Sequence, residues 1–366
     1  MIDARTRKHL DVPLLGLTYT IATFGLVVLF SVSHADPTGF YKKQAIGLLL
    51  GSAALVGAAV IDFHLYARFA RQLYIANLLL LLIVIKKGQV VNGAARWINV
   101  AGFQFQPSEF AKLLIIVTLA VFLVRRLNTV ETPKTLLQSF GYVAVPALLI
   151  FKQPDLGTAL VLIAIWLGMV IIAGARIAHL ALFGLAGALI FAGLWQSGRI
   201  KSYQKNRLIS FVHPESDPRE SGYHVYQARI AIGSGGMWGK GLLHSTQVRG
   251  GYIPEKQSDF IFTDVGEELG FVGSLAVLAL YAGLIWRGAR VIAQTEEDPL
   301  GRLIAAGIVT MLAFHVVVNI GMNVGIMPVA GVPLPLFSAG NSNVLVTMTC
   351  VGLLQSIEFH QHALQF

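Results

Sequence analysis

The sequence predicts an all-α polytopic integral membrane protein, and three observations support this fold class. Hydrophobic residues make up 55% of the 366 residues and charged residues only 13%, whereas soluble domains contain about 25% charged residues. Apolar stretches of about 20 residues, the length that spans a bilayer as a helix, recur from Val12 to Ile357. The basic residues lie mainly between these stretches. The composition therefore favours a single membrane domain over residues 1–366 rather than the two or three soluble domains that length alone suggests.

Ten apolar windows are expected to form about ten transmembrane helices. The first window is long enough to span the bilayer and lacks a small-residue cleavage site, so we expect a helix there and not a cleavable signal peptide. The third, fifth and sixth windows are short or tightly joined to their neighbours. Residues 198–258 are expected to form a large extracytoplasmic loop between helices seven and eight. The windows fall near 12–34, 42–61, 70–87, 107–125, 136–153, 155–174, 177–197, 259–286, 301–328 and 340–358.

The distribution of basic residues predicts the orientation of these helices. With the N-terminus inside, the N-terminal segment and every loop that faces the cytoplasm contain Lys or Arg, as the positive-inside rule requires. The opposite short segments carry a smaller number, so we expect both termini in the cytoplasm. The net charge of +9 then favours an anionic lipid or a phosphorylated substrate, and not nucleic acid, as the partner. The cytoplasmic set is Arg5, Arg7, Lys8, Arg68, Arg71, Arg125, Arg126, Lys134, Arg176, Arg287, Arg290 and Arg302.

The large loop contains two recognisable stretches. Apolar residues at helical spacing in YHVYQARIAIG, from Tyr223 to Gly233, predict an amphipathic helix at the membrane interface. The overlapping stretch GSGGMWGKG has five glycines in nine residues, which predicts a loop whose backbone comes close to a ligand. It is not a phosphate-binding P-loop, because that motif requires a glycine at Ser234 and a Ser or Thr at Gly241.

Polar motifs mark the outer ends of the fourth, sixth, eighth and tenth predicted helices, which all run from outside to inside. Their starts therefore lie at one face of the membrane. A carboxylate at a helix start is also favoured by the helix dipole, by about 0.3 to 1 kcal/mol, and Glu109 and Lys112 could simply neutralise each other. A substrate-facing site and local stabilisation both remain open here. The residues placed at one face are Glu109, Lys112, Asp155, Glu255, Asp259 and Asn341.

Helical geometry separates the acidic residues at the start of the eighth predicted helix. If that helix begins near Asp259, a rise of about 1.5 Å per residue places Glu267 and Glu268 roughly 12 Å deeper. Asp264 is turned about 140° away from Asp259, at about 100° per residue. Asp259 is therefore the candidate reactive group. Glu267 and Glu268 are expected to be buried and paired with Arg, Lys or backbone donors.

The histidines give no metal-binding pattern. His213, His224 and His244 lie in the large loop without metal-ligand spacing, and the sequence contains no HExxH motif. His179 and His315 stand alone in or beside apolar runs and are expected to be packed side chains. The metal content of the site is left unknown.

Taken together, the polar motifs resemble those of the SEDS family (shape, elongation, division and sporulation), most closely its elongation branch, RodA. The division branch, FtsW, is the nearest alternative. The sequence departs from the family near the tenth helix, where SYGGS is usual, because Ala339 replaces the aromatic residue and Asn341 a glycine. The motifs are FQPSEFAK (105–112), QPDLGT (153–158), HPESDP with GYHVYQARIAIGSGGMWGKG (213–241), IPEKQSDFIFTDVGEELGFVG (253–273) and GVPLPLFSAGNS (331–342).

This resemblance implies a ten-helix peptidoglycan glycosyltransferase in the bacterial cytoplasmic (inner) membrane. Such enzymes polymerise lipid II at the extracytoplasmic face and work with a class B penicillin-binding protein, a transpeptidase, and with other membrane proteins of the elongation complex. The essential acid of the family matches Asp259. Glu109, Lys112, Asp155, Lys240 and Glu255 fall at positions that the family's motifs also hold.

The expected reaction is attack by a sugar hydroxyl on an anomeric carbon, with inversion and loss of a lipid diphosphate. Asp259 is the expected general base, a role that typically contributes about 10²- to 10⁴-fold. The diphosphate needs positive charge, from basic side chains or from a bound divalent cation such as Mg²⁺ or Mn²⁺. The expected substrate-binding set is Glu109, Lys112, Asp155, Arg207, Lys240, Glu255, Lys256, Ser338 and Asn341.

Two other functions fit part of the pattern. Acidic residues within spans also occur in transporters, so a lipid II flippase is one alternative. A carrier, however, needs polar groups near the midplane, whereas here they gather at one face. A noncatalytic scaffold of a cell-wall synthase is the other alternative.

Overall fold

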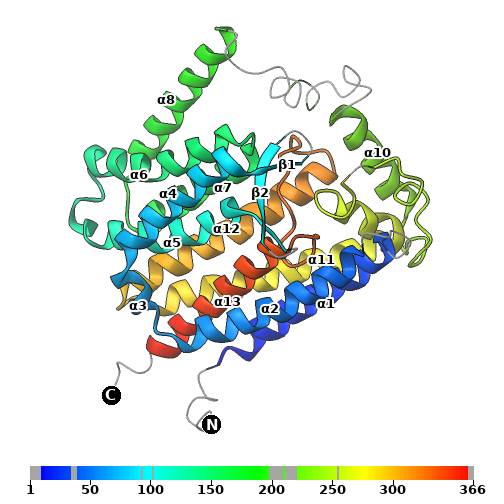
Figure 1. Cartoon of the computed structure of the whole chain (residues 1–366), viewed down its shortest axis with the longest axis horizontal. Helices are drawn as coiled ribbons and strands as arrows, with labels where there is room; N and C mark the ends of the chain where they lie inside the picture. Colours follow the sequence, from blue (N-terminus) through cyan, green and yellow to red (C-terminus); the bar gives the residue numbers. More distant parts are fainter. Residues whose placement is uncertain are drawn as a thin grey trace.

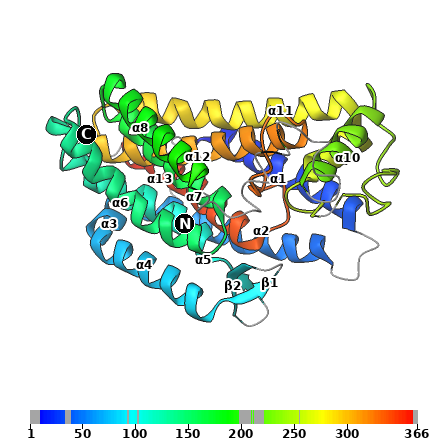
Figure 2. The ribbon, with the colours of Figure 1, turned by 90° about the horizontal axis from the view of Figure 1, so that it is seen from above.

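The structure is a computed structural model that describes residues 10–33, 39–91, 94–100, 103–197, 209, 211, 221–253 and 255–361. Figure 1 shows long helices lying side by side in one bundle, from which helix α8 projects. Figure 2 shows the short helix α3 and the helix α10 at opposite ends of this bundle. The architecture is that of an all-α polytopic membrane protein, as predicted.

Each of the ten predicted windows contains a helix, and the described part of the chain adds two shorter helices, a 3₁₀ turn and three short strands. The helices are α1 (Val12–Ser33), α2 (Phe40–Val60), α3 (Phe63–Arg68), α4 (Ala70–Lys87), α5 (Pro107–Val124), α6 (Pro133–Lys152), α7 (Leu156–Ile172), α8 (Ile177–Gln196), α10 (Ser221–Ser234), α11 (Ile261–Gln294), α12 (Pro299–Asn323) and α13 (Asn341–Gln361). The turn is η2 (Leu127–Thr129), and the strands are β1 (Gln89–Val91), β2 (Ala94–Val100) and β3 (Phe103–Phe105).

Seven of the described helices are long and apolar enough to cross a membrane, namely α1, α2, α5, α6, α11, α12 and α13. Helices α7 and α8 are apolar but shorter, and α4 has Lys86 and Lys87 in its last turn. Helices α5, α12 and α13 are the most buried of the seven, so they form the centre of the bundle. At Gly168 of α7, a Cβ atom would lie 2.0 Å from Thr310 Oγ1 of α12, and this close approach requires glycine.

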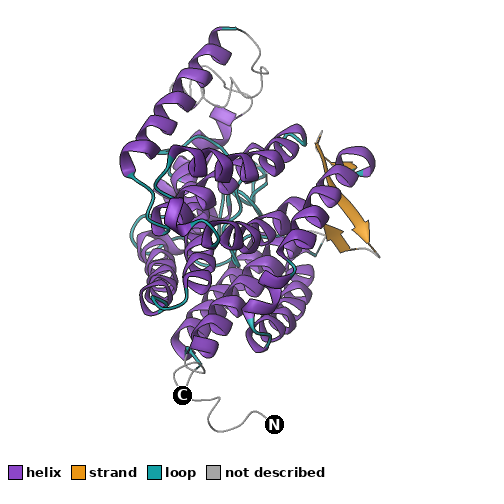
Figure 3. Ribbon diagram, turned by 90° about the vertical axis from the view of Figure 1, so that its left-hand side faces the viewer, coloured by secondary structure: helices purple, strands orange, loops and turns teal. Residues whose placement is uncertain are grey.

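The segment between α4 and α5 forms a small antiparallel sheet that the sequence analysis did not predict. Strand β2 pairs with β1 through Gln89 and Trp97, and with β3 through Ile98 and Phe105. The sheet lies beside the bundle (Figure 3).

Helix α8 differs from the other apolar helices because no described side chain on it is buried. Phe183 in its first half contacts Phe140 and Trp166, with ring centroids 6.1 Å apart in both pairs. Beyond this point the helix leaves the bundle (Figure 1). Its exposed leucines and isoleucines suit contact with lipid acyl chains, as expected for a membrane helix.

The first and last long helices share one end of the bundle. The Asp11 backbone N–H donates to Gln355 Oε1 at 3.1 Å, and Gln355 Nε2 donates to the Asp11 carbonyl at 2.9 Å. Arg287, on α11, pairs with the Asp11 carboxylate at 2.6 Å. The start of α1 and the end of α13 therefore lie together, as an even number of spans requires.

Candidate active site at the start of helix α11

Asp259 lies in the turn that precedes α11, and its side chain is partly exposed. Its backbone N–H donates to the Glu255 carbonyl at 3.1 Å. Its backbone carbonyl accepts two side-chain amides, from Asn319 Nδ2 and Asn323 Nδ2, both at 3.0 Å. The main chain of Asp259 is therefore fixed from both sides, which limits the positions that its carboxylate reaches.

The two asparagines belong to α12 and form a small network of their own. Asn319 Nδ2 also donates to the Val332 carbonyl at 2.8 Å. Asn323 Oδ1 accepts from the Thr263 hydroxyl at 2.6 Å and from its backbone N–H at 3.2 Å. Both asparagines are fully buried. Asn319 and Asn323 were not among the predicted site residues. Two amides four residues apart in an apolar helix are nevertheless costly in a membrane and indicate a function.

The loop between α12 and α13 lies directly beside Asp259. Gly331 has a φ of +68°, and a Cβ atom there would lie 3.5 Å from Asp259 Oδ2. The Ser338 hydroxyl donates to the Ser258 carbonyl at 2.6 Å and accepts from the Leu334 backbone N–H at 2.8 Å. Ser338, predicted to bind substrate, is buried and ties this loop to the segment that carries Asp259.

Glu255 and Lys256 occupy the same turn. Glu255 is exposed, with a left-handed φ of 50°, and its Oε2 accepts from the Ser258 hydroxyl at 3.2 Å. Lys256 is partly exposed, and its Nζ donates to the Val248 carbonyl at 3.0 Å. Both side chains lie at the surface of the site, where a polar substrate would reach them.

Glu109 and Lys112 are placed differently, because they face each other inside the bundle. Lys112 Nζ lies 2.9 Å from both carboxylate oxygens of Glu109, and the two residues are 1% and 3% exposed, respectively. Asn343 Nδ2, from α13, donates to Glu109 Oε2 at 2.9 Å. Of the two interpretations left open by the sequence, the geometry agrees with mutual neutralisation.

His315 of α12 completes this buried cluster. Its Nδ1 lies 3.0 Å from the Pro333 carbonyl and its Nε2 lies 3.1 Å from Lys112 Nζ. A carbonyl only accepts, so the proton is on Nδ1 and Nε2 accepts from the Lys112 ammonium. His315 is buried, in agreement with the prediction of a packed histidine.

Asp155 acts as the N-cap of α7. Its carboxylate accepts from the Thr158 backbone N–H at 3.2 Å and from the Thr158 hydroxyl at 3.0 Å. Ser108, at the start of α5, adds a bond at 3.3 Å, and Arg96 Nη1 of β2 lies 4.0 Å from Asp155 Oδ1. Asp155 is buried, so it links the starts of α5 and α7.

The starts of α5, α7, α11 and α13 therefore meet at one end of the bundle, as the sequence analysis predicted. Besides the Ser108–Asp155 and Ser338–Ser258 bonds, Gln106 N–H donates to the hydroxyl of Ser342 at 3.0 Å. Asn341 begins α13 and is partly exposed. A Cβ atom at Gly47 of α2 would lie 2.9 Å from Asn341 Oδ1, so this side chain packs against α2.

The glycine-rich loop packs closely against α11, and its predicted approach to a ligand stays a prediction. Helix α11 is interrupted at Gly270, where φ is 65° and ψ is −157°. The loop satisfies the backbone groups around this break. Lys240 N–H donates to the Glu267 carbonyl at 3.0 Å, and Phe271 N–H donates to the Gly236 carbonyl at 2.9 Å. A Cβ atom at Gly239 would lie 2.1 Å from the Glu268 carbonyl oxygen, so the backbones touch.

Glu267 and Glu268 are buried and paired, as predicted. Glu267 Oε1 accepts from Lys240 Nζ at 2.7 Å and from the Thr246 and Gln247 backbone N–H groups at 2.8 and 3.0 Å. Glu268 accepts from the Ser31 hydroxyl of α1 at 2.6 Å. Lys240, predicted to bind substrate, therefore holds the glycine-rich loop on α11.

Comparisons with known proteins identify the family. The sequence model of the family described as "Cell cycle protein", which groups FtsW, RodA and SpoVE, matches residues 13–363. The chain belongs to this family. The SEDS prediction is thus confirmed, and the multi-pass membrane architecture agrees with it.

Three known proteins are similar to this chain over nearly their whole length. Stage V sporulation protein E of Bacillus subtilis (strain 168) is 36% identical over 357 residues, covering 95% of this chain and 96% of that protein. Peptidoglycan glycosyltransferase MrdB of Escherichia coli (strain K12) is 37% identical over 361 residues, covering 98% and 96%. A solved structure described as "Structural coordination of polymerization and crosslinking by a peptidoglycan synthase complex" aligns with a TM-score of 0.80 at 31% identity, covering 96% of this chain and 98% of that one.

Two expectations for this FtsW/RodA/SpoVE family member concern the diphosphate. Arg207 lies outside the described residues, so its part in the site stays a prediction. Among the described residues, no three His, Cys, Asp or Glu side chains converge closely enough to hold a metal ion. The described side chains around Asp259 therefore do not make a metal site by themselves.

Proposed function

We propose that this chain is a peptidoglycan glycosyltransferase that polymerises lipid II at the outer face of the bacterial cytoplasmic membrane. The named relative MrdB supports the reaction class. The observation that carries the proposal is the placement of Asp259. Its backbone carbonyl is held by two buried amides and the residue is partly exposed, at the end of the bundle where four helix starts meet.

The proposed step is a single displacement with inversion. Asp259 accepts the proton of the acceptor sugar hydroxyl as the hydroxyl oxygen bonds to the anomeric carbon of the donor. The bond from that carbon to the lipid diphosphate breaks, and the diphosphate leaves with the electron pair. A base within hydrogen-bond reach of the hydroxyl typically contributes about 10²- to 10⁴-fold.

The described basic residues differ in their availability for the leaving diphosphate. Lys112 is buried against Glu109, and Lys240 is bonded to Glu267 and to the Thr246 hydroxyl. Lys256 is partly exposed in the turn of Asp259 and makes a bond to a backbone carbonyl. We therefore propose Lys256, together with Arg207, as the groups that receive the diphosphate charge. If a divalent cation takes part, Glu255 would be one of its ligands, and the cation would supply further positive charge for the diphosphate.

We further propose a role in cell elongation with a class B penicillin-binding protein as partner and with other membrane proteins of the elongation complex. The solved neighbour described as a peptidoglycan synthase complex that coordinates polymerization and crosslinking supports a transpeptidase partner. The similarity to a solved structure of the rod shape determining protein RodA of Thermus thermophilus supports elongation. The similarity to stage V sporulation protein E means that the branch of the family has to be tested.

Purified protein in detergent tests the proposal against both alternatives, because a detergent solution has no compartments. With lipid II as substrate, the chain together with its partner is expected to form glycan polymer. A flippase or a scaffold would form none. Addition of a chelator then tests the cation, since loss of product that Mg²⁺ or Mn²⁺ restores would support it. No polymer under any of these conditions would contradict the proposed function.

A further inference from the structure

A pocket lies at the end of the bundle opposite Asp259. It encloses about 640 Å³ and is lined by α3, α12, α13 and the end of α5. Arg125 directly follows α5, whereas the polar cluster of Glu109 lies at the start of that helix. Eighteen residues of helix at about 1.5 Å each separate the two ends by roughly 27 Å. The pocket is therefore distinct from the candidate active site and independent of the proposed function.

The carboxylates of this pocket are already occupied by internal donors. His64 places Nδ1 2.8 Å from Asp62 and Nε2 3.0 Å from Asp298. Asp62 also accepts from the His64 backbone N–H at 2.9 Å, and Asp298 caps α12 through the Leu300 N–H at 2.9 Å. Burial opposes ionisation of Asp62, but the His64 hydrogen bonds outweigh it and hold the pKa of Asp62 below its usual value.

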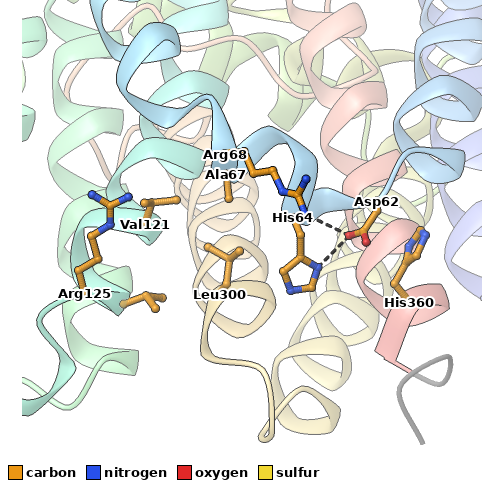
Figure 4. Close-up of a pocket in the computed structure, with 9 residues that line it drawn as sticks. Asp62, His64, Ala67, Arg68, Val121, Arg125, Leu300 and His360 are labelled. Carbon is orange, nitrogen blue, oxygen red and sulfur yellow. Dashed lines mark hydrogen bonds and ion pairs between the residues drawn. The ribbon is translucent and has the colours of Figure 1, made fainter. Parts of the chain in front are cut away.

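The guanidinium groups of the pocket have no such partners. In the described part of the chain, Arg68 and Arg125 form no ion pair with a carboxylate. Figure 4 shows Arg125 on one side of the pocket and Arg68, beside His64 and Asp62, on the other. The lining therefore includes two exposed guanidinium groups that no carboxylate of the described residues pairs with.

The floor between these two arginines is apolar. Ala67, Val121, Val124 and Leu300 line it, with Leu300 between the arginines in Figure 4. Guanidinium groups bind phosphate through paired N–H donors, and they do so better than ammonium groups. A ligand that matches this pocket therefore combines a phosphate with an apolar part.

We propose that this pocket binds the phosphate of an amphiphilic anion, with Arg68 and Arg125 on the phosphate and the valines and Leu300 on the apolar part. An anionic phospholipid has this chemistry, and the basic end of a membrane protein faces the leaflet that is rich in such lipids. A soluble phosphate compound shares the anionic half of the chemistry, so the test includes both sources.

The test uses the full chain purified in a nonionic detergent. Short-chain phosphatidylglycerol, short-chain phosphatidylcholine and inorganic phosphate are titrated separately, with the melting temperature and native mass spectrometry as readouts. We expect phosphatidylglycerol to raise the melting temperature more than the zwitterionic phosphatidylcholine does. If inorganic phosphate alone reproduces the whole shift, and the shift needs both arginines, the phosphate site stands and its ligand is soluble.

Matched variants separate this pocket from the general basic character of the same end. The double variant Arg68→Gln/Arg125→Gln is expected to bind phosphatidylglycerol at least about tenfold more weakly, the loss of one charge-assisted bond. Arg71→Gln/Arg290→Gln removes the same charge outside the pocket and is expected to bind as the wild type does. Ala67→Phe fills the pocket without changing charge and is expected to weaken binding as well. Equal losses in the two double variants, or no binding by the wild type, would overturn the proposal.

Discussion

Two charged clusters at the same end of the bundle are held in opposite ways. In the Glu109–Lys112 cluster the charged side chains bind each other, Asn343 and His315, and they have almost no contact with solvent. In the Asp259 segment the amides of Asn319 and Asn323 bond to the main chain, and the residue is partly exposed. The two clusters therefore differ in burial and in the atoms that these hydrogen bonds join. We expect the buried, mutually paired charges to support the scaffold and the partly exposed Asp259 to lie within reach of substrate.

The largest loss of stability is expected when the buried Glu109–Lys112 pair is broken. Lys112→Met leaves the Glu109 carboxylate buried without its cation, which costs about 3 to 5 kcal/mol when one partner of a buried pair is removed. Thermal or denaturant unfolding in detergent measures this loss. The double variant Glu109→Gln/Lys112→Met is expected to recover part of it, because no charge stays buried. A stable Lys112→Met protein that fails to bind lipid II would instead place Lys112 at the substrate.

The glycine-rich loop belongs with the scaffold, and a pair of glycines tests this. Gly239→Ala places a Cβ atom 2.1 Å from the Glu268 carbonyl oxygen at a φ of +79°, so we expect a loss of about 2 to 3 kcal/mol. Gly236→Ala has a similar φ of +58° but meets nothing within 4 Å. It is expected to cost only about 1 kcal/mol, the strain of a left-handed alanine. Equal losses would mean that the loop does not dock on α11.

Asn319 belongs to both sides of this comparison, because it is buried and it bonds to the backbone carbonyl of Asp259. Asn319→Leu removes a donor from the Asp259 carbonyl and another from the Val332 carbonyl. We expect polymerisation to fall about tenfold or more, since small displacements of a catalytic group are costly. KM for lipid II should change little if Asn319 only positions Asp259. A rise in KM at unchanged kcat would indicate that Asn319 contacts substrate.

The smallest effect is expected for Lys240. After Lys240→Ala, the Glu267 carboxylate keeps the backbone donors of Thr246, Gln247 and Val248, and Lys240 is already 27% exposed in its pair. We expect a loss of about 1 kcal/mol, within the range of partly exposed ion pairs, and retained polymerisation. A folded variant without activity would indicate instead that Lys240 binds the diphosphate.

The sequence predicted those features that depend on local pattern or on helix direction. Apolar windows located all ten predicted helices, because the length needed to span a bilayer is a local property. The alternating direction of successive spans predicted that Asp155, Asp259 and Asn341 lie at one end of the helix bundle. The number of residues between Asp259 and Glu267 predicted that Glu267 lies deeper, and the structure shows Glu267 paired and buried.

Other features depend on contacts between distant segments and were not predicted. The burial of Lys112 requires His315 from α12 and Asn343 beside Glu109 from α13. The break at Gly270 in α11 exists because a loop some thirty residues earlier supplies donors and acceptors for it. Two of the three strands, β1 and β3, have only three residues each, too short for periodicity to reveal. Such features follow from tertiary packing and not from composition.

The most direct test of the central claim is polymerisation of lipid II by Asp259→Asn, purified with its partner, beside Glu255→Gln and the wild type. The backbone bonds to Asn319 and Asn323 do not involve the Asp259 side chain, so the fold is expected to be retained while the rate of polymerisation falls by about 10²-fold or more. A variant that keeps its fold and forms glycan at the wild-type rate would contradict the assignment of Asp259 as the base.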